Sequence, residues 1–132
     1  MRSILISIIS LFFLLSCSTE SSNLLEGKWQ LQQIEEGNLT TKVDTVFYNF
    51  QSSLFMYQIL YNNAERTMSS YGFRTLQGAT LNLELTSYSQ PIEQFITKTD
   101  WERPIRSFTV EEINGKKLVL SDNGKRYIFR KF

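Results

Sequence analysis

TLNLELT, residues 80–86, alternates polar and apolar side chains at every position. In an extended strand, successive side chains point to opposite faces, so Leu81, Leu83 and Leu85 would share one face and the polar residues the other. An α-helix would instead repeat its apolar residues at spacings of three and four. The segment therefore predicts a β-strand that is buried on one face.

Runs of the same kind recur from residue 24 onward and predict eight strands. Short connections join them, and Asn114-Gly115 has the strongest turn chemistry, because both residues tolerate the positive φ of a type I′ hairpin. Neighbours joined by short turns pair antiparallel, since a parallel crossover needs a dozen or more residues. The eight predicted strands are Lys28–Glu35, Val43–Gln51, Ser53–Tyr61, Thr67–Gln77, Thr80–Thr86, Ile105–Ile113, Leu118–Asp122 and Arg126–Phe132.

Eight such strands could form an open sheet with two exposed edges or close into a barrel, which leaves no edge. The sequence thus predicts an all-β, eight-stranded antiparallel up-and-down barrel, with a flat or sandwiched meander as the alternative. In the first strand Trp29 and Leu31 share one parity and Ile34 has the other. A β-bulge near Gln32 or Gln33 would explain the shift, and bulges are how barrels bend their strands.

The first sixteen residues have the pattern of a signal peptide. An apolar stretch, Ile4–Leu15, follows Arg2 and is too short for a membrane-spanning helix, which needs about 20 residues. Leu14-Leu15-Ser16-Cys17 resembles the lipobox of bacterial lipoproteins, in which the cysteine is acylated and becomes the new N-terminus. The resemblance implies that residues 1–16 are removed and that Cys17 is lipidated. The alternative is an ordinary signal peptide with an incidental cysteine, although the chain has no second cysteine to pair with it.

Acylation would anchor the protein to a lipid bilayer, and stable anchoring needs more than one chain. Ser18 follows the cysteine in place of the aspartate that signals inner-membrane retention, so the resemblance implies the outer membrane. Glu20 is the one acidic residue nearby, and this favours the periplasmic face over the cell surface. Residues 17–23 would be the lipidated cysteine and a flexible polar tether, and residues 24–132 the barrel domain.

Composition argues against several functions. Without Arg2 the chain has 13 basic and 13 acidic residues, scattered among one another, so nucleic acid is a poor partner. It has no histidine and one cysteine, which removes most ligands of a metal site, and nothing indicates a cofactor. Glu111 and Glu112 would point to opposite faces of a strand and cannot act as a catalytic pair. We therefore expect a protein that is not an enzyme.

Leu25-Glu26-Gly27-Lys28-Trp29, at the start of the first strand, resembles the Gly-x-Trp opening of lipocalins. A lipobox before such a strand is typical of bacterial lipocalin-like lipoproteins. The resemblance implies a barrel whose bottom is closed by Trp29, following Gly27, with a basic residue of the last strand across the ring. Arg130 is the candidate for that residue and Arg126 the second choice, and a cation over an indole contributes about 0.5 to 2 kcal/mol.

The longest connection, residues 87–103, departs from the lipocalin pattern. Pro91 suits a first helical position, and Ile92, Phe95 and Ile96 would share one helical face, so a short amphipathic helix is expected. Trp101 follows it. The segment could be a lid over a ligand-filled mouth or a plug that fills one end of the barrel.

Aromatic residues of one parity provide a candidate ligand site. Facing inward, they would line an apolar pocket in which hydroxyl groups and Arg74 hold the polar end of a ligand. Facing one another, they would simply fill a small barrel. The candidate ligand-binding residues are Phe55, Tyr57, Tyr71, Phe73, Arg74 and Trp101.

Two functions remain open at this point. The first is a lipoprotein that binds a small amphipathic or hydrophobic ligand in the cell envelope. The second is a protein-interaction module with a filled barrel, an accessory subunit or inhibitor, whose exposed strand faces include Leu54, Met56 and Leu60. Neither pattern identifies a particular ligand or a protein partner.

Overall fold

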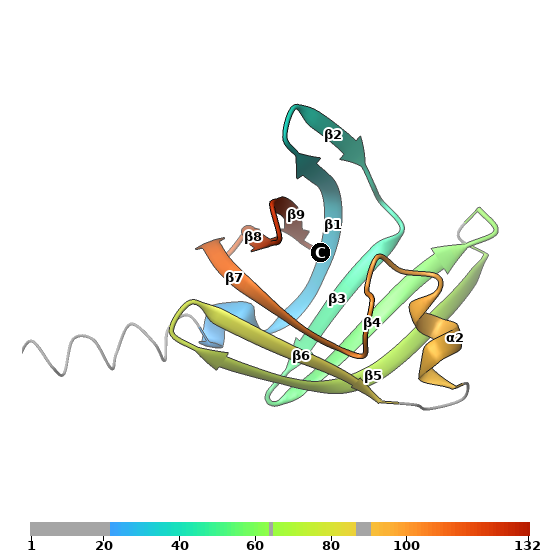
Figure 1. Ribbon diagram of the computed structural model, residues 1–132. Coiled ribbons are helices and arrows are strands. Elements are labelled where there is room, and N and C mark those ends of the chain that lie inside the picture. Colours follow the sequence, from blue (N-terminus) through green and yellow to red (C-terminus); the bar gives the residue numbers. More distant parts are fainter. Residues whose placement is uncertain (1–21, 64, 87–90) are drawn as a thin grey trace, which may run out of the picture.

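The computed structural model describes residues 22–63, 65–86 and 91–132 (Figure 1). A helical turn at residues 22–25 precedes the first strand. The described residues then form nine strands, with one short helix, α2 (Ile92–Ile96), between the sixth strand and the seventh. The strands are β1 (Gly27–Glu36), β2 (Leu39–Lys42), β3 (Val46–Gln51), β4 (Leu54–Tyr61), β5 (Arg66–Gln77), β6 (Thr80–Thr86), β7 (Ile105–Ile113), β8 (Lys117–Asp122) and β9 (Lys125–Lys131).

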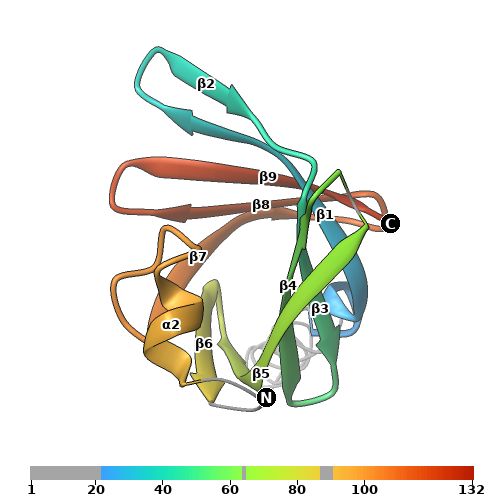
Figure 2. The same ribbon diagram turned by 90° about the vertical axis from the view of Figure 1, so that its right-hand side faces the viewer.

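Eight of these strands close into an antiparallel barrel. They pair in the order β1-β3-β4-β5-β6-β7-β8-β9, and β9 pairs with β1 from Trp29 opposite Lys131 to Glu36 opposite Lys125. The strands curl around one interior (Figure 2). The predicted up-and-down barrel is confirmed, and the alternative of an open meander is wrong.

β2 is an addition to the barrel, and its residues were predicted to be part of a connection. It forms a hairpin with the second half of β1, from Gln33 opposite Lys42 to Glu36 opposite Leu39. The first half of β1 pairs with β3 instead. Beyond that point the edge of β1 would be unpaired, and β2 covers it. All four residues of β2 are exposed, and the hairpin projects from the barrel wall (Figure 2).

The predicted bulge in the first strand is confirmed. The register between β1 and β9 shifts between Leu31 and Gln33, so Gln32 is the extra residue. The shift allows Trp29 and Leu31 to be buried while Ile34, of the opposite parity, also packs against the core. A second register shift, between Val110 and Glu112 on β7, was not predicted.

The predicted turn at Asn114-Gly115 lies where it was expected, between β7 and β8, but its predicted type is wrong. Asn114-Gly115 does not adopt the positive φ of a type I′ turn; instead the Asn114 side-chain oxygen accepts hydrogen bonds from the backbone N–H groups of Lys116 (2.8 Å) and Lys117 (2.9 Å). The two-residue turn with positive φ at both positions is Asn123-Gly124, between β8 and β9, with φ of 50° and 80°. An asparagine side chain can replace a backbone turn, and sequence alone does not distinguish the two uses.

The core confirms the alternation in residues 80–86. Leu81, Leu83 and Leu85 are buried, and they contact a cluster rich in aromatic residues inside the barrel. The predicted short helix is also confirmed, with Pro91 as the residue before its first turn and Phe95 buried.

The predicted signal peptide, Cys17 and the tether up to residue 21 lie outside the described residues. Residues 22 and 23, assigned to the flexible tether, belong to the helical turn. No helix among the described residues is both long and apolar enough to cross a membrane.

Candidate functional site

The barrel has two ends. The closed end carries the start of β1, the β3–β4 turn and the end of β9. The mouth, at the other end, carries the connection of residues 91–104 and the Asn123-Gly124 turn. This connection contains α2 and lies at the end of the barrel opposite the helical turn of residues 22–25 (Figure 1).

Three of the predicted ligand-binding residues lie together under the mouth. The Trp101 ring is nearly parallel to the Phe55 ring, with centroids 6.1 Å apart, and meets the Tyr57 ring at a steep angle, 5.7 Å away. Phe95 packs edge-on against Tyr57 at 5.4 Å. Trp101 Nε1 donates a hydrogen bond of 3.1 Å to the hydroxyl of Tyr48. These side chains are buried against one another, so residues 91–104 occupy the mouth as a plug does.

Burial keeps the inner hydroxyl groups neutral. Loss of solvation raises the pKa of Tyr48 well above its usual value, and the nearby Tyr57 adds to the shift. The pKa of Tyr57 is raised in the same way, chiefly by burial and then by the charge of Asp100. Both phenols therefore offer hydrogen bonds, not charge, to any group that reaches them.

Tyr71 and Phe73 do not lie in this group, contrary to the prediction. On β5 the inward positions are Ser70, Gly72 and Arg74, which are buried, while Tyr71 and Phe73 are exposed. The register explains this, because Tyr71 is paired with Met56 and Phe73 with Leu54, all on the outer face. Alternation along β5 fixes the two parities but not which of them faces inward.

Arg74 faces inward, as predicted, but lies at the closed end, where its guanidinium carbon is 5.9 Å from the centre of the Phe50 ring, which stacks on Phe55. Its Nη2 donates to Glu26 Oε1 at 2.7 Å, and the backbone N–H of Ser52 donates to the same oxygen at 2.8 Å. The Arg74 side chain is almost completely buried. It thus ties β5 to the start of β1 and to the β3–β4 turn.

The basic residue across Trp29 is Lys131, and the prediction of Arg130 is wrong. Lys131 Nζ lies 4.6 Å from the centre of the Trp29 ring and donates a short hydrogen bond to the carbonyl of Glu26. Arg130 points outward and donates to Gln30 Oε1 at 3.1 Å. The second choice, Arg126, is also outside.

Gly27 and Trp29 occupy the structural positions expected of them. Trp29 is fully buried, and its Nε1 donates to the carbonyl of Leu25 at 2.8 Å. Gly27 has φ +112°, and a Cβ there would lie 2.6 Å from Lys131 Nζ. A side chain at position 27 would therefore displace the lysine from the ring.

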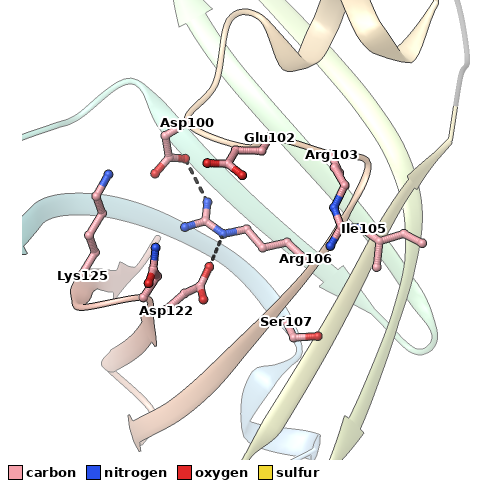
Figure 3. Close-up of a pocket in the computed structure, with 9 residues that line it drawn as sticks. Asp100, Glu102, Arg103, Ile105, Arg106, Ser107, Asp122 and Lys125 are labelled. Atoms are coloured by element: carbon pink, nitrogen blue, oxygen red, sulfur yellow. Dashed lines mark hydrogen bonds and ion pairs between the residues drawn. The ribbon is translucent and has the colours of Figure 1, made fainter.

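The polar cluster of the mouth surrounds Arg106, a residue that was not among the predicted site residues (Figure 3). Its Nη1 donates to Asp100 Oδ1 and its Nε to Asp122 Oδ2, both at 3.0 Å. Its Nη2 donates to the Tyr127 hydroxyl at 2.7 Å, and that hydroxyl donates a short hydrogen bond to Asp100 Oδ2. The guanidinium carbon also lies 4.5 Å from the centre of the Phe108 ring.

The pKa shifts in this cluster follow from its geometry. Burial alone would lower the pKa of Arg106, but Tyr48, Asp100 and Tyr127 outweigh it and raise the pKa above its usual value. Burial, together with the hydrogen bond to Asp100, raises the pKa of Tyr127 to about 12. Arg106 is therefore a fixed positive charge that is held from three sides.

An open cleft of about 600 Å³ lies beside Arg106. It separates the first residues of β7 from the β8–β9 hairpin, because β7 pairs with β8 only from Thr109 onward. Basic and acidic side chains alternate around it, and this favours a small polar or charged group over an apolar one. The lining residues are Asp100, Glu102, Arg103, Ile105, Arg106, Ser107, Asp122, Asn123 and Lys125.

A sequence signal for Arg106 did exist. On β7, Arg106 shares the parity of Phe108, which is buried, and of Val110. An arginine at an inward position of an alternating strand needs partners, because a buried unpaired charge is costly. Those partners come from three separate segments of the chain, and only the folded structure brings them together. No group of three or more acidic, histidine or cysteine side chains among the described residues is arranged to hold a metal ion.

Among the solved structures that are similar to this chain are two proteins from Bacteroides. A lipocalin-like protein from Bacteroides uniformis is 34% identical, with a TM-score of 0.74, and the match covers 83% of this chain and 99% of that one. An uncharacterized protein from Bacteroides eggerthii is 25% identical, with a TM-score of 0.68, and the match covers 82% and 99%. Comparison with curated proteins gives no match. The family model of the lipocalin-like domain matches residues 11–132. The chain therefore belongs to the family of lipocalin-like domains.

Proposed function

We propose that this protein is a lipid-anchored lipocalin-like protein of the bacterial cell envelope that binds a small amphipathic molecule at the barrel mouth. The lipobox-like Leu14-Leu15-Ser16-Cys17 supports the anchor, and the family supports a binding role. The observation that carries the proposal is Arg106, an almost buried cation directly beside the aromatic residues of the mouth.

Asp100 and Trp101 connect the two parts of the site. Asp100 pairs with Arg106, and the next residue, Trp101, lies against Phe55. An outward shift of this one segment would free a guanidinium edge and an aromatic surface together. A ligand with an acidic head and an apolar tail would then replace the Asp100 carboxylate and the Trp101 ring. Ligands of mixed character suit a site in which a polar cleft, beside Arg106, adjoins aromatic side chains, as here with Trp101.

Arg106 would keep its position during such an exchange. Asp122 holds its Nε, and Tyr127 accepts from its Nη2, so the loss of Asp100 leaves two partners in place. A cation that is already oriented loses little conformational freedom when it binds, and this lowers the cost of binding. Charge-assisted hydrogen bonds from arginine to a carboxylate or phosphate are also among the stronger ones.

Fluorescence of Trp101 tests ligand binding. Trp29→Phe leaves Trp101 as the single tryptophan, and the probes are an alkyl carboxylate and the alcohol of the same chain length. We expect the carboxylate to produce a saturable red shift, because Trp101 moves from a buried to a wet position, and the alcohol to bind more weakly. Arg106→Lys should reduce the difference between the two probes, because lysine cannot make a bidentate contact. Trp101 emission unchanged by the carboxylate at saturation would rule out this binding mode.

The anchor needs a separate experiment. Mass spectrometry of the protein purified from membranes should find acyl chains on Cys17 as the first residue, and Cys17→Ser should prevent this processing. An unmodified Cys17 in the membrane-derived protein would contradict the anchor without affecting the binding proposal.

A second function, a protein-interaction module with a filled barrel, is favoured by the outer wall. Leu54, Met56, Tyr71 and Phe73 form two directly paired rows on β4 and β5, and the inner aromatic residues already contact one another. Leu60, also expected on this face, is half-buried. Cross-linking in intact cells should then recover a single stoichiometric partner, attached at the outer wall and not at the mouth.

A further inference from the structure

The outer wall carries an apolar patch that neither the core nor the mouth uses. Leu54 pairs with Phe73 and Met56 with Tyr71, so the four side chains form a rectangle on the outer face of β4 and β5. Leu54 and Phe73 are each 51% exposed, and Tyr71 is 43% exposed. We call these four residues the outer patch. Apolar groups that gather on one surface usually mark a contact site.

A hollow of about 500 Å³ adjoins the outer patch and leads to the start of β1. Leu54, Met56 and Tyr71 line it together with Glu26, Gly27 and Lys28. Glu26 forms an ion pair with Arg74 through Oε1, which also accepts from the Ser52 N–H, so its charge is already balanced. Lys28 is therefore the charge in this lining that remains for a partner, and its ammonium group lies over the rings of Phe47 and Phe132. Aromatic and aliphatic groups beside a lysine complement the interface of a membrane with anionic headgroups.

The chain enters the domain next to this hollow. The helical turn of residues 22–25 leads directly into Glu26, one of the lining residues. Four residues separate Cys17 from Ser22, and the five Cα–Cα steps between them span at most about 17 Å when extended. An acyl anchor on Cys17 would hold this end of the domain close to the bilayer. Contact between the domain surface and the bilayer would then cost little additional translational entropy.

We infer that the outer patch lies on the surface of the bilayer in which Cys17 is anchored, with Lys28 toward the headgroups. The inference rests on the anchor of the proposed function but not on ligand binding. Tyr71 and Phe73 reach the interface, and the hollow accommodates lipid beside Leu54. The helical turn of residues 22–25 and α2 lie at opposite ends of the barrel, so the mouth lies at the end that is remote from the anchor (Figure 1). A soluble ligand would then reach Arg106 from the aqueous side.

Fluorophores on single introduced cysteines test this orientation in the full acylated protein, reconstituted in vesicles of phosphatidylethanolamine and phosphatidylglycerol. Leu54→Cys and Phe73→Cys place the fluorophore in the outer patch, and Ile105→Cys places it on an equally exposed position at the mouth. With nitroxide-labelled lipids, we expect strong loss of fluorescence at positions 54 and 73 and little at position 105. All three positions are exposed, so none of the substitutions should prevent folding.

The outcomes separate this inference from the proposed function. Equal quenching at all three positions, in protein whose Cys17 is shown by mass spectrometry to carry acyl chains, overturns the inference and leaves the anchor intact. A Cys17 without acyl chains removes the anchor and the inference with it. Quenching at position 54 that falls as the protein-to-lipid ratio rises identifies the patch as a contact between copies of this chain, which also overturns the inference.

Discussion

Lys131 shows how one residue organises the closed end. Its ammonium group contacts the Trp29 ring and the Glu26 carbonyl, and it reaches both because Gly27 has no side chain. Burial lowers the pKa of Lys131, although Glu26 acts in the opposite sense. The ammonium group thus loses part of its hydration and gains contacts with the Trp29 ring and the Glu26 carbonyl.

Gly27→Ala should destabilise the fold by about 1 to 3 kcal/mol, because φ +112° is strained for alanine and the new Cβ would meet Lys131. Urea unfolding followed by tryptophan fluorescence measures the change. Gly115→Ala is the matched control, since no positive φ and no close contact constrain that position, and it should alter stability little. Equal effects at both positions would contradict the role given to Gly27.

Lys131→Met should lower the free energy of unfolding by about 1 to 2 kcal/mol through loss of the cation–π contact and the hydrogen bond. Arg130→Met should change it by less than about 0.5 kcal/mol, as for most surface substitutions. Thermal unfolding of the two variants side by side gives the comparison. A larger loss from Arg130 would restore the assignment made from the sequence.

The sequence predicted the kind of interaction here but not the residue. A Gly-x-Trp opening implies a cation from the last strand, and that strand carries four basic residues, Lys125, Arg126, Arg130 and Lys131. The choice depends on register, since Trp29 is paired with Lys131 and Gln30 with Arg130. The bulge at Gln32 changes the count between the two strands, and its effect cannot be worked out without the pairing.

At the scale of the element, residues 91–104 act as a unit that covers the aromatic interior. The helix contributes Phe95 and the segment after it Trp101, and both pack against Tyr57. The carbonyl of Pro104 accepts a hydrogen bond of 2.8 Å from the Leu85 N–H, which fixes the end of the segment to β6.

Trp101→Ala should destabilise the protein by roughly 3 to 5 kcal/mol, the usual range for a large buried aromatic side chain. Chemical denaturation measures this loss, and Ile105→Ala, at an exposed position just after the segment, serves as the control. A loss below that of the control would show that the segment is not part of the cooperative fold. Recovery of stability on addition of an apolar probe would indicate that the vacated space binds it.

β2 should open more readily than the barrel that it extends. Its residues are exposed, and it pairs with β1 alone. Hydrogen exchange should therefore find low protection for the amides of β2 and high protection for those of β9 paired with β1, because local opening requires less free energy where little surface is buried. Similar protection in both would mean that β2 unfolds together with the barrel.

Elements with one apolar face were predicted well, and elements with two were not. The three leucines of β6 share one parity and are its only apolar residues, so they alone indicate which face of the strand is buried. β5 carries Tyr71 and Phe73 on one parity and Gly72 and Arg74 on the other, so composition suggests the wrong inner face. Pairing with β4 determines which face of β5 points inward, and this pairing cannot be predicted from the sequence of β5 alone.

At the scale of the whole molecule, closure of the barrel brings groups from distant segments into one buried network. Tyr48, Tyr57 and Tyr127 come from β3, β4 and β9, and their pKa values are all raised, mainly by burial. Their ionisation is coupled to the stability of the whole barrel.

Stability should fall as pH rises through the range of these tyrosines. The pKa of Tyr127 is about 12 in the folded protein and 10.0 without the protein environment, so its stabilisation is fully present below pH 10 and is lost as pH rises toward 12. Lys131, with a lowered pKa, contributes in the opposite sense, so the informative comparison is with Tyr127→Phe. Urea unfolding from neutral to alkaline pH should show a flatter decline for that variant. If the free energy of unfolding of Tyr127→Phe fell with pH as steeply as that of the unsubstituted protein, Tyr127 would not be the cause of the decline.

Topology followed from the sequence because every connection but one is short, and short connections leave antiparallel neighbours as the sole pairing. The Arg106 cluster did not follow, since Asp100, Asp122 and Tyr127 are separate in sequence and meet only after closure. Local patterns predict local structure, and a site assembled across the barrel depends on long-range register.

The contact between β9 and β1 also affects how the chain can fold. Its two members lie about a hundred positions apart, and β9 is the last of the nine described strands in chain order. Without β9 the sheet has two unpaired edges and cannot close, so the barrel forms only after all of its strands are available. Removal of β9 would leave an open sheet with two unpaired edges, which is prone to self-association.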